Sequence, residues 1–325
     1  MDARIAQVWQ RTLRILACWF IVLLLPLSSA RADAISAWHA IAEQVIAASE
    51  HQPARAARSM ATVSIAVFET MNFILGKYEP RFLVKPQRAL GSSGEIEAIG
   101  AAHHVLTQLH PDRNDVLDTA LDRFLAAHPN QDAALRARIW GRNLGGAVFA
   151  SWSTDVHAQD ASPPNISGHP KGIAPSGGPA THLLAWSPEV RRFIASTALN
   201  PIERARIYAL TSSAANSVHV AAAATRDSQS AATPCVACAV AAAIQTVMER
   251  EFESAGLARF DLRTSTMRAE ASTLRVTNTG TMNKRSIEAS ENLGKKLGMD
   301  ALAFFRPVVR PFAPLQGYSI GITDR

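Results

Sequence analysis

The chain has 325 residues, of which 48% are hydrophobic, so it can bury a sizeable core in one large domain or two ordinary ones. Its net charge is +6, but four of the 33 basic residues and one of the 27 acidic residues lie in the first 32 positions, which leaves +3 for the rest. The chain carries no dense basic stripe with interleaved aromatic residues, which excludes nucleic acid as a partner.

The first 32 residues have the pattern of a signal peptide. Three arginines precede an apolar run over residues 15–27, and Ala30 and Ala32 have the Ala-x-Ala spacing of a signal-peptidase site. We expect cleavage near Ala32 and export to the periplasm or the medium. A retained anchor is the alternative, but the apolar run is short against the roughly 20 residues that span a bilayer. After cleavage we expect no membrane span.

Beyond residue 32, apolar residues recur with a 3.6-residue period almost throughout, which predicts an all-α fold, a helical bundle of roughly nine to ten helices. In the N-terminal helical region, residues 33–152, the expected helices cover residues 35–49, 54–75, 93–109, 113–128 and 132–152. Ser93 is the expected N-cap of the third helix. The glycines of the fifth indicate close contact with another helix.

Residues 153–186 are rich in proline and glycine and have no helical period, so we expect a long loop there. The C-terminal helical region, residues 187–305, has expected helices at 187–196, 200–225, 235–256 and 284–305. Asn200 and Glu203 have the spacing of a capping box around Pro201. The last segment, residues 306–325, holds three prolines and is expected to be extended.

Several segments, in their order along the chain, resemble those of bacterial vanadium-dependent haloperoxidases, which are relatives of the type 2 phosphatidic acid phosphatases. In the first half they are AWHAIAEQVIAAS at 37–49, ARSMATVSIAVFETMNFILGKYEP at 57–80 and residues 98–126. In the second half they are ERARIYAL at 203–210, TPCVACAVAAAIQTVM at 233–248 and residues 270–298.

The resemblance implies a helical-bundle enzyme that binds vanadate, or phosphate in the phosphatases, between helices of its second half. Such an oxyanion needs charge-assisted donors, backbone N–H groups at a helix N-terminus and an axial histidine. A second histidine serves as acid or base. The family supplies these groups from three motifs: Lys-x6-Arg-Pro, Pro-Ser-Gly-His and Ser-Arg-x5-His.

Most of these groups are missing from this chain. No lysine stands seven places before either Arg-Pro pair of the tail, so the first motif is absent. The second motif falls on PCVAC, where Ala237 occupies the position of the acid-base histidine. The third motif fits Arg275, but Thr281 stands where the axial histidine belongs, and no histidine follows His219. Of the anion-binding groups, only Arg275 and the helix N-terminus at Cys235 remain, enough at most for weak phosphate or vanadate binding.

Cys235 and Cys238 are the only cysteines after the signal peptide. Their one-turn spacing permits a disulfide, and an oxidising compartment favours one. Packed thiols and a redox couple with a lowered cysteine pKa are the other readings. A closed zinc site needs four ligands, so a zinc site is not expected here.

We expect no bound cofactor and no metal. Four acidic residues near the start of one helix suggest either a calcium site or carboxylates that the helix dipole favours, and we prefer the second explanation. They are Asp112, Asp115, Asp118 and Asp122.

The sequence therefore predicts an exported, all-helical member of the vanadium-dependent haloperoxidase and acid phosphatase superfamily that has lost its catalytic residues and is an inactive pseudoenzyme. Whether it is an enzyme stays open, because two alternatives remain. One is an active phosphatase or haloperoxidase that uses residues outside the motifs, such as His157, His169 or His182. The other is a thiol–disulfide protein built on Cys235 and Cys238. No partner is identified, and a homo-oligomer also stays open.

Overall fold

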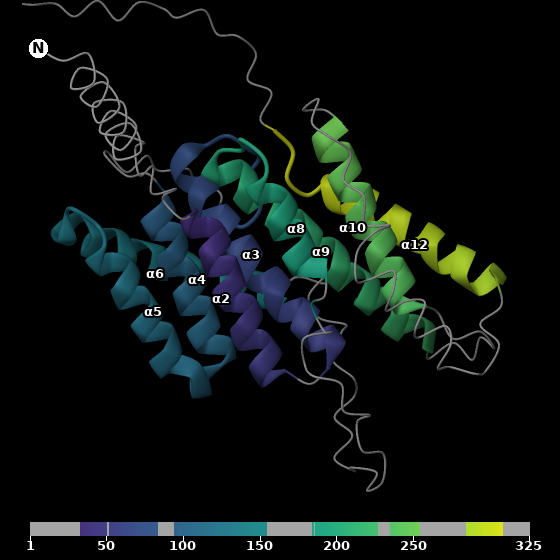
Figure 1. The fold of residues 1–325 in the computed structure, drawn as a ribbon, viewed down its shortest axis with the longest axis horizontal. Coiled ribbons are helices and arrows are strands. Elements are labelled where there is room, and N and C mark those ends of the chain that lie inside the picture. Colours follow the sequence, from purple (N-terminus) through teal and green to yellow (C-terminus); the bar gives the residue numbers. More distant parts are fainter. Residues whose placement is uncertain are drawn as a thin grey trace, which may run out of the picture.

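The protein is all-helical in the computed structural model, which describes residues 33–50, 52–83, 94–154, 184, 186–226, 235–253 and 284–307. These residues form nine α-helices, one short 3-10 helix and no strand, so the predicted all-α fold is confirmed for this part of the chain (Figure 1). The helices are α2 (Ala34–Ser49), α3 (Pro53–Leu75), α4 (Glu95–Leu109), η1 (Pro111–Arg113), α5 (Asn114–Ala126), α6 (Gln131–Thr154), α8 (Trp186–Ala195), α9 (Pro201–Arg226), α10 (Val236–Glu253) and α12 (Lys284–Leu302).

The ends of two helices, α9 and α4, agree differently with the local sequence signals. The capping box is confirmed at α9, where the Asn200 amide donates to Glu203 Oε2 at 3.0 Å and the Glu203 amide donates to Asn200 Oδ1 at 3.1 Å. The prediction of Ser93 as an N-cap is wrong. Gly94 takes that position with φ 77°, a left-handed conformation that glycine adopts without steric cost. Ser93 itself lies outside the described residues.

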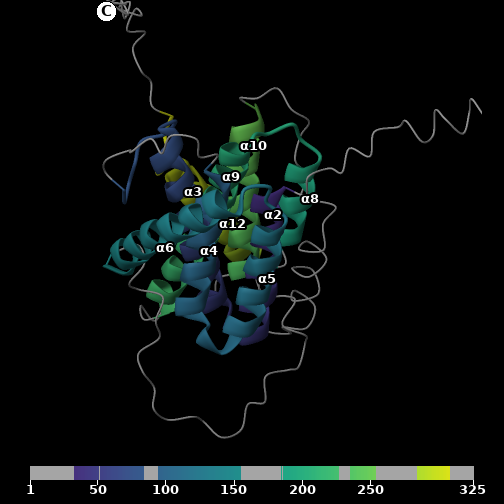
Figure 2. The same cartoon turned by 90° about the vertical axis from the view of Figure 1, so that its left-hand side faces the viewer.

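Helix α3 is the centre of the bundle. Every residue from Ser59 to Asn72 is buried, as expected of a helix that is surrounded on all sides. Helices α2, α4 and α6 pack against it, and α9 packs along it from the other direction. The successive layers run from α5 and α6 through α4, α2 and α3 to α9, α10 and α12 (Figure 1). Figure 2 shows the same bundle from the side of α5 and α6.

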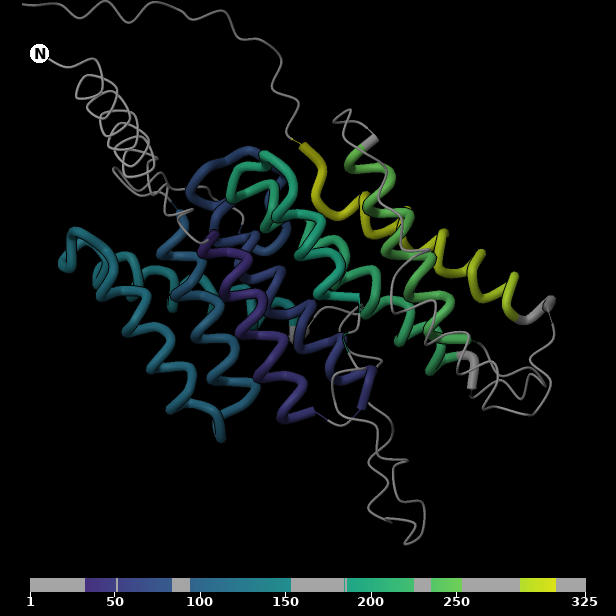
Figure 3. Tube along the Cα trace, in the orientation of Figure 1, coloured from purple at the N-terminus to yellow at the C-terminus, as the bar shows by residue number. Residues whose placement is uncertain are grey.

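Two helix pairs approach so closely that glycine is required. A Cβ on Gly141 of α6 would lie 2.7 Å from the carbonyl carbon of Glu97 on α4. A Cβ on Gly294 of α12 would lie 2.8 Å from the carbonyl carbon of Ala239 on α10. The close helix contact predicted from the glycines of α6 is thus confirmed, and α10 and α12 form a second tight pair beside α9 (Figure 3).

The turn after α3 is held by polar residues of α3 itself. Asn72 Oδ1 accepts from the Tyr78 amide at 2.8 Å, and its Nδ2 donates to the Tyr78 carbonyl at 3.0 Å. Glu69 Oε2 accepts from the amides of Arg81 and Phe82. This turn also pairs with the chain after α12 through an isolated β-bridge between Tyr78 and Pro307. These contacts join the two halves of the chain.

Three expected segments fall mainly outside the described residues: the signal peptide at 1–32, the loop at 153–186 and the tail at 306–325. At the borders of the loop, α6 continues to Thr154 and α8 begins at Trp186.

Candidate functional site

The start of α10 is where the family resemblance puts the oxyanion. Cys235 precedes the first helical residue, and its carbonyl accepts the Ala239 amide at 3.0 Å, as an N-cap residue does. The Cys235 amide donates to Ser290 Oγ of α12 at 3.0 Å. The Cys238 amide points at Cys235 Sγ at 3.2 Å. Two of the N–H groups at this helix end therefore already have partners within the protein.

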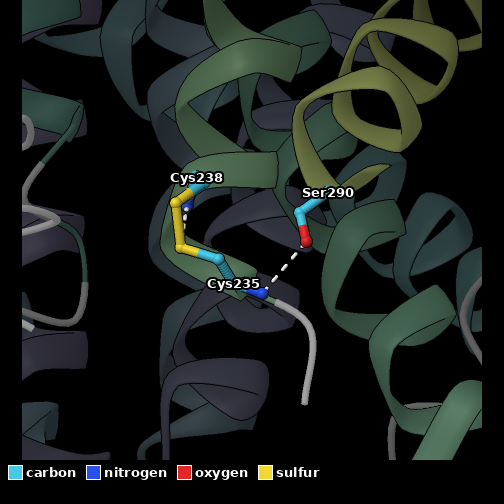
Figure 4. The surroundings of a disulfide bond; sticks show 3 residues. All are labelled: Cys235, Cys238 and Ser290. Carbon is cyan, nitrogen blue, oxygen red and sulfur yellow. Dashed lines mark hydrogen bonds between the residues drawn. A yellow bond between two sulfur atoms is a disulfide. The ribbon is translucent and has the colours of Figure 1, made fainter. Parts of the chain in front are cut away.

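A disulfide joins Cys235 and Cys238 across this first turn, with an S–S distance of 1.98 Å (Figure 4). Both residues are buried, with exposed fractions of 6% and 5%, and Ile287 of α12 packs against them. Figure 4 shows the disulfide and Ser290 on opposite sides of the Cys235 backbone. The disulfide sulfur and the Ser290 hydroxyl thus occupy the Cys238 and Cys235 amides at this end of the helix.

This arrangement is poorly suited to oxyanion chemistry. A helix N-terminus binds an anion through amide N–H groups that point at the ligand, and here the Cys235 and Cys238 amides point at internal acceptors. Ala237, where the resemblance expects a histidine, is half-buried and has no polar side-chain atom. Position 237, where the resemblance places the acid–base group, therefore supplies none.

The other residues suggested for the site cannot be placed. Arg275 and Thr281 lie outside the described residues, and so do His157, His169 and His182. His219 lies on α9 and is half-buried. Neither α10 nor α12 contains a histidine.

In the described part of the chain, no three histidine, cysteine, aspartate or glutamate side chains are grouped as metal ligands would be. The acidic residues around α5 are used otherwise: Asp118 lies 2.7 Å from His103 Nε2, and Asp112 lies 3.2 Å from Arg113 Nε. None of the helices within the described ranges combines the length and the apolar character needed to cross a bilayer.

A buried polar cluster between α2, α8 and α9 was not identified from the sequence. At its centre, the His39 ring stacks on the Tyr208 ring with centroids 3.8 Å apart. Ser187 Oγ lies 3.5 Å from His39 Nδ1 and donates to Glu43 Oε2 at 3.0 Å. Arg191 Nη1 of α8 also donates to that carboxylate, at 2.5 Å. We call these five residues the His39 cluster.

The cluster continues toward the start of α2. The Tyr208 hydroxyl lies 2.7 Å from Ser36 Oγ, which in turn donates to Asp33. Arg204 Nη1 pairs with Asp33 at 2.9 Å. Burial, and secondly the charge of Arg191, hold the pKa of His39 well below its ordinary value. Burial raises the pKa of Tyr208.

Serine beside histidine suggests a nucleophile and its base, but the geometry does not support that chemistry. Ser187 is completely buried, so no substrate reaches its Oγ. Its hydroxyl donates to Glu43 and not to His39, whereas a base must accept the proton of the nucleophile. The His39 cluster therefore holds three helices together. The sequence does contain a signal for it, because Ser36, His39 and Glu43 are spaced along one face of α2.

No protein-family model, no curated protein and no solved structure matches this chain.

Proposed function

We propose that this is an exported, non-catalytic helical protein of the vanadium-dependent haloperoxidase and type 2 phosphatidic acid phosphatase kind. Support for the family comes from the order of the resembling segments along the chain. Support for export comes from the basic, apolar and Ala-x-Ala pattern of the first 32 residues. The helical bundle is compatible with both, and its role is to be a folded module for interaction or assembly.

The observation that carries the absence of catalysis is the closed start of α10. The Cys235 amide is held by Ser290 and the Cys238 amide by a sulfur, while Ala237 offers no proton donor or acceptor. With no histidine beyond His219, residues 220–325 provide neither an axial ligand for vanadium nor a covalent nucleophile of the phosphatase type. Arg275 alone can attract an anion but cannot move a proton.

Two activity assays test the proposal on the exported, purified protein. One titrates vanadate and follows peroxide-dependent oxidation of bromide and chloride. The other follows hydrolysis of p-nitrophenyl phosphate. We expect both rates to equal those of the blank.

Two variants identify the source of any activity. Arg275→Ala removes the remaining anion-binding side chain, and Arg136→Ala, an exposed arginine of α6, is its matched control. An activity that Arg275→Ala abolishes and Arg136→Ala retains would overturn the proposal. It would establish a working phosphatase or haloperoxidase that uses residues outside the motifs.

Thiol–disulfide exchange is a second candidate, because a Cys-x-x-Cys disulfide at the start of a helix is the arrangement of many oxidoreductases. The burial of both cysteines argues against it, since exchange requires access to a sulfur atom. Insulin reduction by dithiothreitol, with and without the protein, decides between the two. We expect no acceleration; an acceleration that Cys235→Ser removes would establish the second candidate.

A further inference from the structure

Helix α8 lies at the edge of the described bundle and has four buried residues. Among the described helices, α8 packs mainly against α2. Along the chain, it is flanked by the described residue 184 and by the turn that leads to α9. Trp186, Val190 and Ile194 provide its buried apolar side, and Phe193 meets Phe252 of α10 edge to face. The polar part of the attachment is the pair of Ser187 and Arg191, the two members of the His39 cluster on α8, which both bind Glu43 of α2.

The hydrogen bonds determine where the proton of neutral His39 lies. Ser187 donates its hydroxyl proton to Glu43, so its Oγ can only accept from the imidazole. The neutral ring therefore carries its proton on Nδ1 and leaves Nε2 bare. Nε2 is buried and has no hydrogen-bond partner among the described residues. A bare ring nitrogen is tolerable there, whereas an N–H at that position would be an unpaired buried donor.

The charges that face the ring do not offset a second proton. On α2, Glu43 already accepts from both Ser187 and Arg191 of α8. On α9, Tyr208 covers one face of the ring, and Arg204 pairs with Asp33 at the start of α2. On the side of α4, His103 packs against Trp38 and not against His39. A protonated His39 would be a buried cation beside Arg191, and the Glu43 carboxylate is already engaged.

We propose that His39 is an acid-sensitive latch: when it takes up a proton, α8 separates from α2 and α10 while the rest of the bundle stays folded. The remaining bundle does not depend on this contact, because α3 is packed by α4 and α9, and α10 by α12. After release, His39 is hydrated and has its ordinary pKa of 6.5. Burial and Arg191 keep its pKa in the closed state far lower, so acid favours the open state. The opening equilibrium constant rises as the pH falls below about 6.5, and its slope approaches tenfold per pH unit, the limit for a one-proton linkage.

Hydrogen–deuterium exchange between pH 8 and pH 5, divided by the intrinsic exchange rate at each pH, measures this opening directly. In the wild type we expect amides of residues 186–195 to become less protected below pH 6.5, by about thirtyfold in all between pH 8 and pH 5, before those of α4 change. His39→Phe keeps a ring that can stack on Tyr208 but cannot titrate, so its α8 exchange should not vary with pH. Glu43→Gln is the matched control: it should weaken α8 at every pH and keep the acid response.

Three results would overturn the latch. One is α8 protection that is unchanged between pH 8 and pH 5 in the wild type. The second is an acid response that persists in His39→Phe or disappears in Glu43→Gln, which would assign the proton to the carboxylate. The third concerns the wild type alone and applies even if His39→Phe does not fold: equal loss of protection in α8 and α4 at the same pH means global acid unfolding and no latch.

Discussion

The close approach of α4 and α6 makes a strong prediction for Gly141. Its substitution by alanine places a methyl group 2.7 Å from the carbonyl carbon and 2.8 Å from the Cα of Glu97. Both atoms belong to the backbone of α4 and cannot move without the whole helix. Gly146 lies on the same helix, but its added methyl would meet only the end of the His104 ring, at 3.2 Å. The two positions therefore differ in what the new methyl group displaces.

The expected change in the free energy of unfolding combines two opposing contributions. Alanine stabilises a helix interior relative to glycine by about 1 kcal/mol at either position. At Gly141 this gain is outweighed, because an extra methyl group in a closed contact costs roughly 3 kcal/mol when the neighbour cannot relax. We expect Gly141→Ala to lower the free energy of unfolding by about 2 kcal/mol, and Gly146→Ala to change it by no more than about 1 kcal/mol in either direction.

Urea unfolding followed by far-UV circular dichroism measures both values, with the m-value as a check that the unfolded state is unchanged. Thermal unfolding should separate the two variants by roughly 2–5 °C, because a chain of this length shifts by only about 2 °C per kcal/mol. If Gly141→Ala proved as stable as Gly146→Ala, the close approach of α4 and α6 would not exist in solution, and the position of α6 in the bundle would be wrong.

Two further substitutions test other contacts. Asn72→Ala removes both hydrogen bonds to the Tyr78 backbone and should lower the free energy of unfolding by about 1–3 kcal/mol. Its control, Asn143→Ala on the exposed side of α6, should change the free energy of unfolding by less than about 0.5 kcal/mol. Equal losses in the two variants would contradict the role of Asn72. Dithiothreitol should lower stability by at most about 2 kcal/mol, because the disulfide between Cys235 and Cys238 closes a very short loop. The Cys235→Ala/Cys238→Ala double variant should not respond, and two free thiols in unreduced, denatured protein would refute the disulfide.

The helices could be predicted from the sequence because each has its own local signal. The apolar period, the capping box at Asn200 and the prolines near the starts of α3 and α9 all act within a few residues, so no knowledge of the partner is needed. The N-cap of α4 was predicted wrongly because it depends on a backbone angle and not on a local side-chain signal. Gly94 occupies the N-cap because the backbone there has a φ of 77°. The capping preferences of serine and similar residues do not reveal that angle.

The candidate site could be predicted only in part, because its decisive contacts join distant residues. PCVAC indicates a cysteine pair at the start of a helix, and the structure has that pair there. That Ser290 occupies the Cys235 amide, across 55 residues of sequence, cannot be read from either segment alone. The same is true of the His39 cluster, in which Ser187 is separated from Glu43 by 144 residues.

The residues that carry the resemblance in the first half have a role of their own, independent of any oxyanion. In ETMN, Glu69 and Asn72 bind the backbone of the turn after α3, and Tyr78 of that turn pairs with the chain beyond α12. These contacts hold the two halves together and contain none of the groups that bind vanadate or phosphate in the family. Under the proposed family relation, this part of the pattern is therefore explained by folding alone and carries no information about oxyanion binding.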